Sequence, residues 1–291
     1  MGPVALIVGL GWFAGTRMDF DVGTLSRLAF WVLGPVFVLD VFSGADLDRV
    51  TVVKLTIGAL AVMAIGGIVA FILTRGLKTT PSRTKAIVMT STYGNVGNAG
   101  LAICAFAFGE EAIPAAAVLM IVVNTTGIFV GVVLASAQTN GVGSAVKRSL
   151  LTPMTIAAIA TIAMNTLGVD LPVALDRSIS IVAGGLIPVM LLTLGLQMAA
   201  DVRPKLSADT AIVVATKLMI VPLAAGLFGS LLGLEGDDLG VLIIQSSMPP
   251  AVFTAVVALE FNLEAEYVTR TVLGTTLIAL LTTPLALVLV T

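Results

Sequence analysis

The sequence predicts an all-α membrane protein, with ten transmembrane helices in two inverted five-helix repeats that contain crossed broken helices. Three observations support this fold class: long uncharged apolar segments, an uneven distribution of basic residues, and a shared offset between the two halves. Of the 291 residues, 58% are hydrophobic and 11% are charged, and the mean hydropathy is +1.10. A soluble domain carries about 25% charged residues. Because a soluble core of this length cannot hide so much apolar surface, lipid must be the solvent.

Charged residues divide the chain into apolar segments of the length that crosses a bilayer, which takes about 20 residues per helix. The second segment contains Asp40, and the eighth contains Asp209 and Lys217. The ten predicted spans are residues 3–16, 25–42, 55–74, 86–109, 112–146, 149–169, 178–200, 208–234, 239–259 and 271–291.

Lysine and arginine accumulate in cytoplasmic loops, and their distribution orients the spans. Of the 15 basic residues, eleven fall in one set of loops, three fall in the other set, and Lys217 lies inside the eighth span. The eleven are Arg17, Arg27, Arg75, Lys78, Arg83, Lys85, Lys147, Arg148, Arg203, Lys205 and Arg270. We therefore expect a multi-pass protein of the plasma (inner) membrane with both termini outside.

The two halves of the chain resemble each other at one offset. A shift of 153 residues places Pro35 on Pro188 and segment 108–112 on segment 261–265. The halves, residues 1–145 and 150–291, each hold five spans, so the second inserts upside down relative to the first. Inverted repeats are typical of secondary transporters, whose substrate site lies at the repeat interface near the midplane.

Two spans contain residues that disfavour a continuous helix. The fourth reads Gly-Asn-Val-Gly-Asn-Ala-Gly at 94–100, and each glycine costs about 1 kcal/mol relative to alanine. The ninth contains Pro249 and Pro250, which both lack a backbone donor. The same 153-residue shift places 248–250 on 95–97. Irregular backbone at membrane depth requires protein or a wet cavity around it, so we predict two broken helices at a binding site.

The paired breaks define the candidate site. The N-terminal ends of half-helices carry free N–H groups and positive partial charge, which suit an anion. A lysine inside the membrane costs about 2.5–3.5 kcal/mol on insertion scales. Three roles are open for Lys217: binding a substrate carboxylate, neutralising carbonyls of the broken helices in place of a coupled cation, or pairing with an acid. The candidate substrate-binding residues are Thr92, Asn95, Gly97, Asn98, Gln245, Ser246, Ser247, Pro249, Pro250 and Lys217.

Composition limits the chemistry of this site. The chain has no histidine and a single cysteine, Cys104. Histidine-ligated zinc, Ser-His-Asp or Cys-His catalysis and a histidine proton relay are therefore excluded. One cysteine cannot form an intrachain disulfide or a cysteine-clustered metal site. We expect no enzyme activity, no cofactor and no metal site.

Three motifs carry a resemblance to a known family. Segments 25–35, 94–101 and 248–252 resemble the second, fourth and ninth spans of the auxin efflux carrier family, within the larger bile/arsenite/riboflavin transporter-like superfamily. The resemblance implies ten helices, a scaffold domain, a transport domain with crossed broken helices and elevator-like movement. It also implies organic anion substrates, such as indole acetate or dicarboxylates. The chain departs from the family at Ala102, where proline is usual, which leaves the geometry of the fourth-span crossover open.

The leading functional hypothesis is a secondary transporter that moves a small organic anion, auxin-like or malate-like, by alternating access. Its expected partners are the substrate, the lipid bilayer, a coupling ion (H⁺ or Na⁺) and a second copy in a homodimer, with no nucleic acid. A sodium-coupled symporter of the bile acid type and a non-transporting sensor are the alternatives. Aromatic content is 5%, and no aromatic residue is obviously placed to stack on an indole ring, which favours aliphatic acids.

Overall fold

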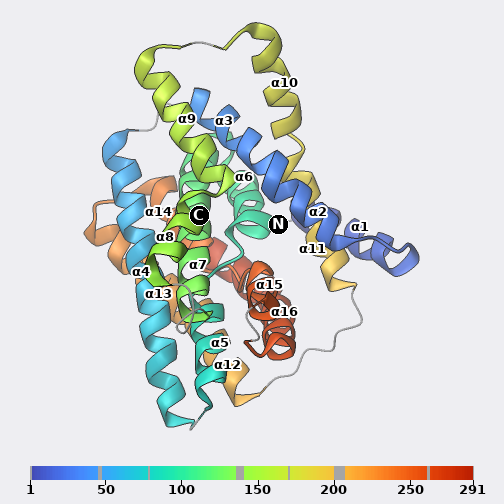
Figure 1. The fold of residues 1–291 in the computed structure, drawn as a ribbon, viewed down its shortest axis with the longest axis vertical. Helices are drawn as coiled ribbons and strands as arrows, with labels where there is room; N and C mark the ends of the chain where they lie inside the picture. The colour runs from blue at the N-terminus through green and yellow to red at the C-terminus, as the bar shows by residue number, and fades with distance from the viewer. Residues whose placement is uncertain are drawn as a thin grey trace.

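The computed structural model describes residues 2–44, 48–77, 79–135, 141–169, 171–199, 207–260 and 263–290. Within these ranges the chain forms helices joined by short turns, and none of it is assigned to a β-strand element (Figure 1). Lys78, Arg203, Lys205 and positions 261–262, used above for orientation and for the repeat, lie outside the described residues. In the first half the helices are α1 (Gly2–Arg17), α2 (Val22–Leu28), η1 (Ala29–Leu33), α3 (Gly34–Gly44), α4 (Arg49–Gly76), α5 (Pro81–Thr92), η2 (Val96–Leu101), α6 (Ala102–Phe108), η3 (Glu110–Ala112) and α7 (Ile113–Ala135).

The second half contains a similar succession of helices. It comprises α8 (Gly141–Leu150), α9 (Pro153–Leu167), α10 (Val173–Ala183), α11 (Leu186–Met198), α12 (Ala208–Ala215), η4 (Thr216–Ile220), α13 (Val221–Leu231), α14 (Gly236–Ser246), α15 (Phe253–Glu260) and α16 (Ala265–Val290). Here η1, η2 and η4 are π-helical turns, whereas η3 is a 3₁₀ turn.

Local sequence explains where several helices begin. Thr80 and Thr152 each precede a proline, and their hydroxyls accept the backbone N–H of Arg83 at 3.2 Å and of Thr155 at 3.3 Å. A threonine N-cap followed by proline suits a helix start, because the cap satisfies a free donor and proline has none to lose. α5 and α9 therefore begin at fixed points of the sequence.

Six described helices are long and apolar enough to cross a membrane: Val22–Ser43, Arg49–Gly76, Glu110–Leu134, Val173–Met198, Ala208–Leu231 and Ala265–Val290. The other four predicted spans correspond to the shorter helices α1 and α9 and to the interrupted pairs α5–α6 and α14–α15. The predicted fifth span, 112–146, is too long. α7 ends at Ala135, and residues 141–150 form the separate helix α8, on which Lys147 is exposed.

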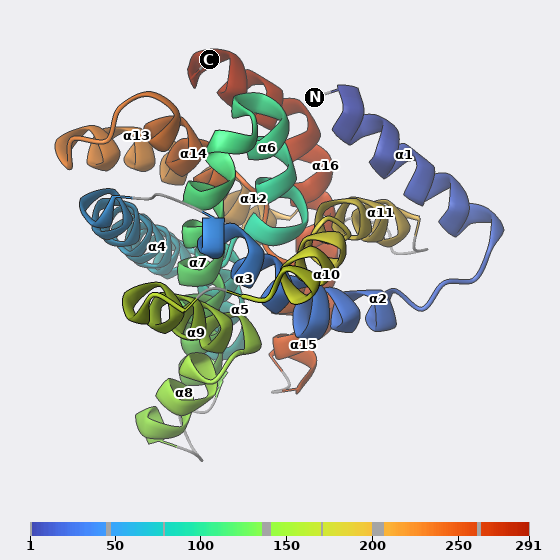
Figure 2. The ribbon, with the colours of Figure 1, turned by 90° about the horizontal axis from the view of Figure 1, so that it is seen from above.

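The contacts between helices divide them into two groups, which we call bodies, and α3 of the first group lies between α9 and α10 (Figure 2). In the first, called here the scaffold body, α1 packs on α11, α3 packs on α9 and α10, and α2 packs on α11. In the second, the crossing body, α4–α7 pack with α12–α16. Gly11 and Gly195 allow the close approach of α1 to α11: a Cβ on Gly11 would overlap the backbone of Leu192, and one on Gly195 would overlap that of Val8. The Gly11-x-x-x-Gly15 motif is thus a packing motif.

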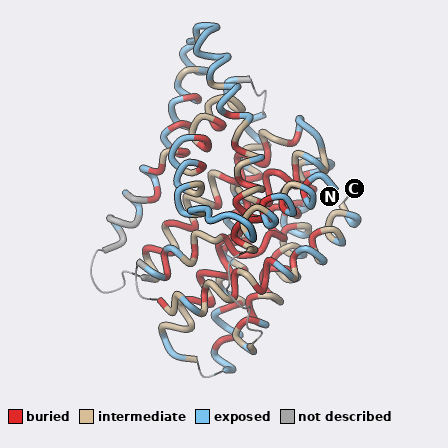
Figure 3. Tube along the Cα trace, turned by 90° about the vertical axis from the view of Figure 1, so that its right-hand side faces the viewer, coloured by how far each residue is buried: buried red, intermediate tan, exposed pale blue. Residues whose placement is uncertain are grey.

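Exposure to solvent differs between the centre and the outside of the molecule (Figure 3). Buried residues lie at the centre of the molecule, and large apolar side chains on the outer helices are exposed, such as Leu6 at 76% and Ile181 at 79%. This outer apolar surface is what a protein surrounded by lipid requires.

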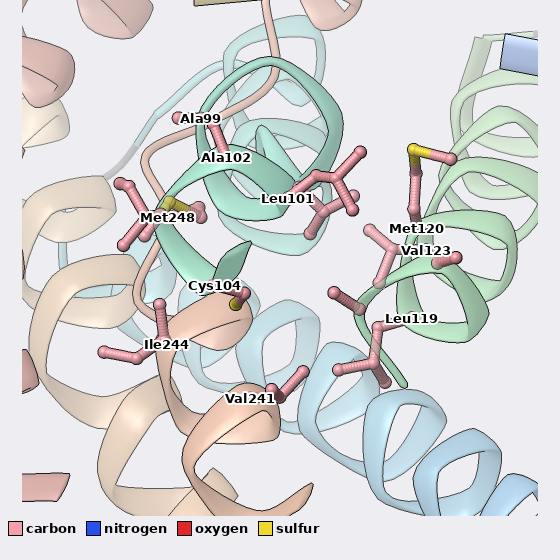
Figure 4. Close-up of a cluster of buried hydrophobic side chains, with 14 of the residues drawn as sticks. Ala99, Leu101, Ala102, Cys104, Leu119, Met120, Val123, Val241, Ile244 and Met248 are labelled. Carbon is pink, nitrogen blue, oxygen red and sulfur yellow. The ribbon is translucent and has the colours of Figure 1, made fainter. Parts of the chain in front are cut away.

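A cluster of buried apolar side chains lies where α6 meets α7 and α14 (Figure 4). Leu101, Cys104, Leu119 and Ile244 are almost completely buried there. Ala102 lies in this cluster at 1% exposure, and its N–H donates to the Ala99 carbonyl. A proline at position 102 could not make that bond. The helix is interrupted earlier in the sequence, between Thr92 and Val96.

Candidate functional site

Two non-helical segments, one from each half of the chain, cross at the centre of the crossing body. α5 ends at Thr92 and α14 ends at Ser246, and the following residues run antiparallel, with a bridge between Gly94 and Pro250. The Asn95 N–H donates to the Pro249 carbonyl at 2.8 Å, and the Ala251 N–H donates to the Tyr93 carbonyl at 2.9 Å. Each segment thereby satisfies part of the backbone of the other, which an interior away from water requires. We call this arrangement the crossing.

Lys217 lies directly against the crossing. Its side chain is 4% exposed, and its Nζ donates to the Ser246 carbonyl at 3.3 Å. A Cβ on Gly94 would come within 2.9 Å of the same Nζ, so the ammonium occupies the space that glycine leaves. Among the described residues, no ion pair joins Lys217 to a carboxylate. Its described polar partner is therefore the main-chain carbonyl of Ser246 rather than an acid.

Helix ends explain why a cation is stable at this place. α5 and α14 both finish at the crossing, and each helix C-terminus carries about half a negative charge. Two such ends sum to about one negative charge, which one ammonium offsets. Thr92, Gln245 and Ser246 share with Lys217 the lining of a small void of about 20 Å³. We call it the lysine void.

A separate cavity of about 120 Å³ borders the crossing and is lined by residues of both bodies. The crossing body contributes residues 93–98 and 251–253, which include the first residues of η2 and α15. The scaffold body contributes Ser26, Phe30, Met154, Met190 and Gln197. Because helices begin here, this crossing cavity receives N-terminal helix ends, whereas the lysine void receives C-terminal ones.

Unpartnered amide groups mark the crossing cavity. The Asn95 side chain is 5% exposed, and within the described part of the chain its Nδ2 has no hydrogen-bond partner. Gln197 is 8% exposed, and neither its Oε1 nor its Nε2 has a described partner. A buried polar group without a partner costs about 1–3 kcal/mol. Each of these groups calls for a partner, such as an ordered water or a polar ligand.

The sequence-predicted residues gather at the crossing but line different cavities. Asn95, Gly97 and Asn98 line the crossing cavity, whereas Thr92, Gln245, Ser246 and Lys217 line the lysine void. Pro250 forms the bridge with Gly94, and Pro249 accepts from Asn95 and also borders a third, apolar cavity of about 550 Å³. The Ser247 hydroxyl donates to Ile244 within its own turn. These residues therefore do not form one continuous lining.

Aromatic side chains form a wall of the crossing cavity, so the expectation that none is placed at the site is wrong. The Phe253 ring lies 6.1 Å from the Tyr93 ring and stacks on Phe30 with centroids 6.0 Å apart. The Tyr93 hydroxyl donates to Asn124 Oδ1 at 2.7 Å. Tyr93 precedes the glycine motif and Phe253 follows the proline pair, and this nearness to the breaks was the available signal.

Gln197 and Asn124 are also functional candidates that sequence reasoning missed. Both are uncharged amides within apolar spans. Polar side chains inside the membrane tend to face protein or a cavity. That rule could have identified both residues as candidates, but it could not have predicted that they line the same cavity.

A network of charges lies at the far end of the crossing body. Arg83 Nε lies 3.7 Å from Asp209 Oδ2, and its Nη2 lies 3.3 Å from Glu264 Oε2. The same guanidinium lies over the Tyr267 ring, 3.9 Å from its centroid. Arg83 therefore joins the beginnings of α5, α12 and α16.

Replacing Arg83 by glutamine is expected to destabilise the folded protein by about 1–2 kcal/mol, because it removes partly exposed ion pairs and a cation–π contact. Thermal unfolding in detergent measures this. Arg270→Gln is the matched control: its 2.6 Å pair with Glu266 lies on one exposed helix face and should contribute about 0.5 kcal/mol or less. Equal effects of the two variants would contradict the assignment.

Comparison with known proteins identifies the family. A family profile described as membrane transport protein matches residues 139–287. The chain belongs to this family, the auxin efflux carriers. It is a multi-pass integral membrane protein of a transporter family.

Several relatives match nearly the whole carrier. An uncharacterized transporter of Methanothermobacter thermautotrophicus is 25% identical over 97% of this chain and 94% of its own length. A second, from Methanocaldococcus jannaschii, is 22% identical over 96% of this chain and 94% of its own length. The uncharacterized transporter YfdV of Escherichia coli K12 is 23% identical over 89% of this chain and 87% of its own length. Each alignment thus covers most of the carrier and most of the relative.

Proposed function

We propose that this carrier moves a small organic anion across the plasma membrane by alternating access, with the substrate bound in the crossing cavity. The observation that carries the proposal is the crossing itself. Two interrupted segments meet at a cavity lined by both bodies, and buried amide atoms there have no partner among the residues that the structure describes. Movement of the crossing body against the scaffold body would expose the cavity to the two sides of the membrane in turn.

The order and packing of the helices support two inverted repeats and ten spans. At the offset of 153 residues, α1 corresponds to α9 and α3 corresponds to α11. The packing is exchanged accordingly, since α1 packs on α11 while α3 packs on α9. The interrupted pair α5–α6 corresponds likewise to α14–α15. This exchange of partners supports a two-fold relation between residues 1–145 and 150–291.

The chemistry of the cavity favours an anion with an apolar part. N-terminal helix ends and the Asn95 Nδ2 offer hydrogen-bond donors to a carboxylate. Tyr93, Phe30 and Phe253 offer an apolar wall. A volume of about 120 Å³ equals that of about four waters, which suits a small acid in a site that still has to open and close.

Lys217 favours transport without sodium. Its ammonium lies against the carbonyl of Ser246 at the crossing, where a bound metal cation would need the same oxygen. A fixed cation there supplies the positive charge that a coupled sodium ion would bring. Of the three roles open from the sequence, neutralising the carbonyls of the interrupted helices therefore fits best.

Flux into proteoliposomes tests the proposal. The purified carrier is expected to move at least one labelled acid from a panel of aliphatic and aromatic carboxylates, at a rate unchanged when sodium is replaced by potassium. Protein-free liposomes are the control. Binding of an acid without flux would indicate a sensor, and sodium-dependent flux would indicate a symporter; either result overturns the proposal as stated.

The proposed orientation, with both termini outside, has a separate test. Cys104 is completely buried, so single cysteines added at exposed positions can be labelled against a low background. Lys147→Cys is expected to react with an impermeant maleimide only after the membrane is opened, and Glu235→Cys is expected to react in intact cells. The reverse pattern would show that the orientation is wrong.

A further inference from the structure

Among the polar side chains that the scaffold body contributes to the crossing cavity, Gln197 is the most deeply buried. It lies in the last turn of α11, which ends at Met198, and it is 8% exposed. Its amide has one donor group and one acceptor atom, and within the described residues both lack a partner. Exchange of the amide nitrogen and oxygen leaves this unchanged. Folding thus keeps both a donor and an acceptor unused on one wall of the cavity.

Asn95, which belongs to the crossing body, lines the same cavity. The completely buried amide atoms that lack a described partner in these two residues are two donor groups, Asn95 Nδ2 and Gln197 Nε2, and one acceptor, Gln197 Oε1. A carboxylate only accepts hydrogen bonds. It can satisfy Asn95 Nδ2 and Gln197 Nε2, and it leaves Gln197 Oε1 without a partner.

We propose that Gln197 determines specificity by accepting a hydrogen bond from a hydroxyl or N–H group that the substrate carries beside its carboxylate. This inference rests on the proposed function and narrows its substrate class. A site with a buried acceptor discriminates against a ligand that lacks the matching donor, because the acceptor then stays dehydrated and unpaired. Since Gln197 and Asn95 belong to different bodies, the substrate meets both only while the bodies are in this arrangement.

Pairs of acids that differ in one donor group test the inference. Malate and succinate differ by a hydroxyl, and indole acetate and naphthalene acetate differ by an N–H. The wild-type carrier in proteoliposomes is expected to prefer the donor-bearing member of a transported pair by about tenfold in KM, the effect of one hydrogen bond. Gln197→Leu is expected to remove this preference, and folding should tolerate the change because it deletes an unsatisfied buried amide.

Two further variants separate recognition from packing. Gln197→Glu keeps the acceptor and adds negative charge, so it should raise KM for every acid, while the preference within each pair remains. Thr193→Val is the matched control, because Thr193 lies one turn earlier on α11, is 2% exposed and donates within its own helix to Val189 at 2.7 Å. It should leave the preference unchanged.

The outcomes distinguish this inference from the proposed function. If wild type moves these acids without a preference, or if Gln197→Leu retains the preference, Gln197 is not the specificity residue although the carrier still transports. If wild type moves none of the four acids, the proposed substrate class fails and the inference fails with it.

Discussion

Replacing Lys217 by methionine is expected to abolish transport while the protein still folds and reaches the membrane. Methionine has nearly the length of lysine, so the change removes the charge and keeps most of the shape. The C-terminal ends of α5 and α14 would then leave about one uncompensated negative charge beside the crossing. An anion in the neighbouring cavity would be repelled. Flux in proteoliposomes, normalised to the amount of folded protein, measures the effect.

Stability separates this role from a structural one. The variant loses the hydrogen bond to the buried Ser246 carbonyl, which costs about 1–3 kcal/mol, but it no longer carries the insertion cost of an intramembrane lysine, about 2.5–3.5 kcal/mol. Because the two terms oppose each other, Lys217→Met should unfold within a few degrees of the wild-type temperature. Lys54→Met is the matched control, because Lys54 also donates to a main-chain carbonyl, that of Gly233 at 2.8 Å, away from the crossing. It should retain transport. Wild-type flux in Lys217→Met would show that the charge has no part in the mechanism.

Replacing Asn95 by alanine is expected to raise KM for the transported acid by about 10–100-fold, the range for a hydrogen bond to a charged group. The crossing itself should persist, because it uses the backbone N–H of Asn95 rather than the side chain. The side-chain Nδ2, unpartnered among the described residues, is the group that the variant removes. Concentration-dependent flux provides KM and the maximal rate separately.

A charged substitution at position 95 tests whether the substrate is an anion. Asn95→Asp should weaken transport further than Asn95→Ala if the substrate is an anion, because a carboxylate would then face a carboxylate. Asn165→Ala is the control, since the Asn165 amide donates to the Phe42 carbonyl at 2.8 Å at the exposed end of α9. If Asn95→Asp transports better than Asn95→Ala, the substrate is not an anion.

Much of the architecture follows from residue chemistry that is readable in the sequence. Glycine at Gly94 and proline at Pro249 and Pro250 disfavour helix wherever they occur, and both interruptions lie beside them. The burial of Lys217 also follows, since a charge in a long apolar segment must avoid lipid. These predictions succeed because they depend on the backbone and on solvation.

The division of the site into two cavities could not be predicted in the same way. The side to which Lys217 turns depends on the π-helical turn Thr216–Ile220, whose extra residue shifts the register of the following helix. The placing of Phe253 against Phe30 and Tyr93 depends on packing between bodies that are distant in sequence. Spans that are apolar on all faces have no periodicity that indicates which side chains meet.

The contact between Gly94 and Lys217 couples the two positions. A Cβ at position 94 would come within 2.9 Å of the Lys217 Nζ, so a side chain there would push the ammonium away from the crossing. The flexible lysine stem can accommodate this shift, but the helix ends would then lose their counter-charge. A residue larger than glycine at position 94 is therefore expected to impair the same step as removal of the lysine charge.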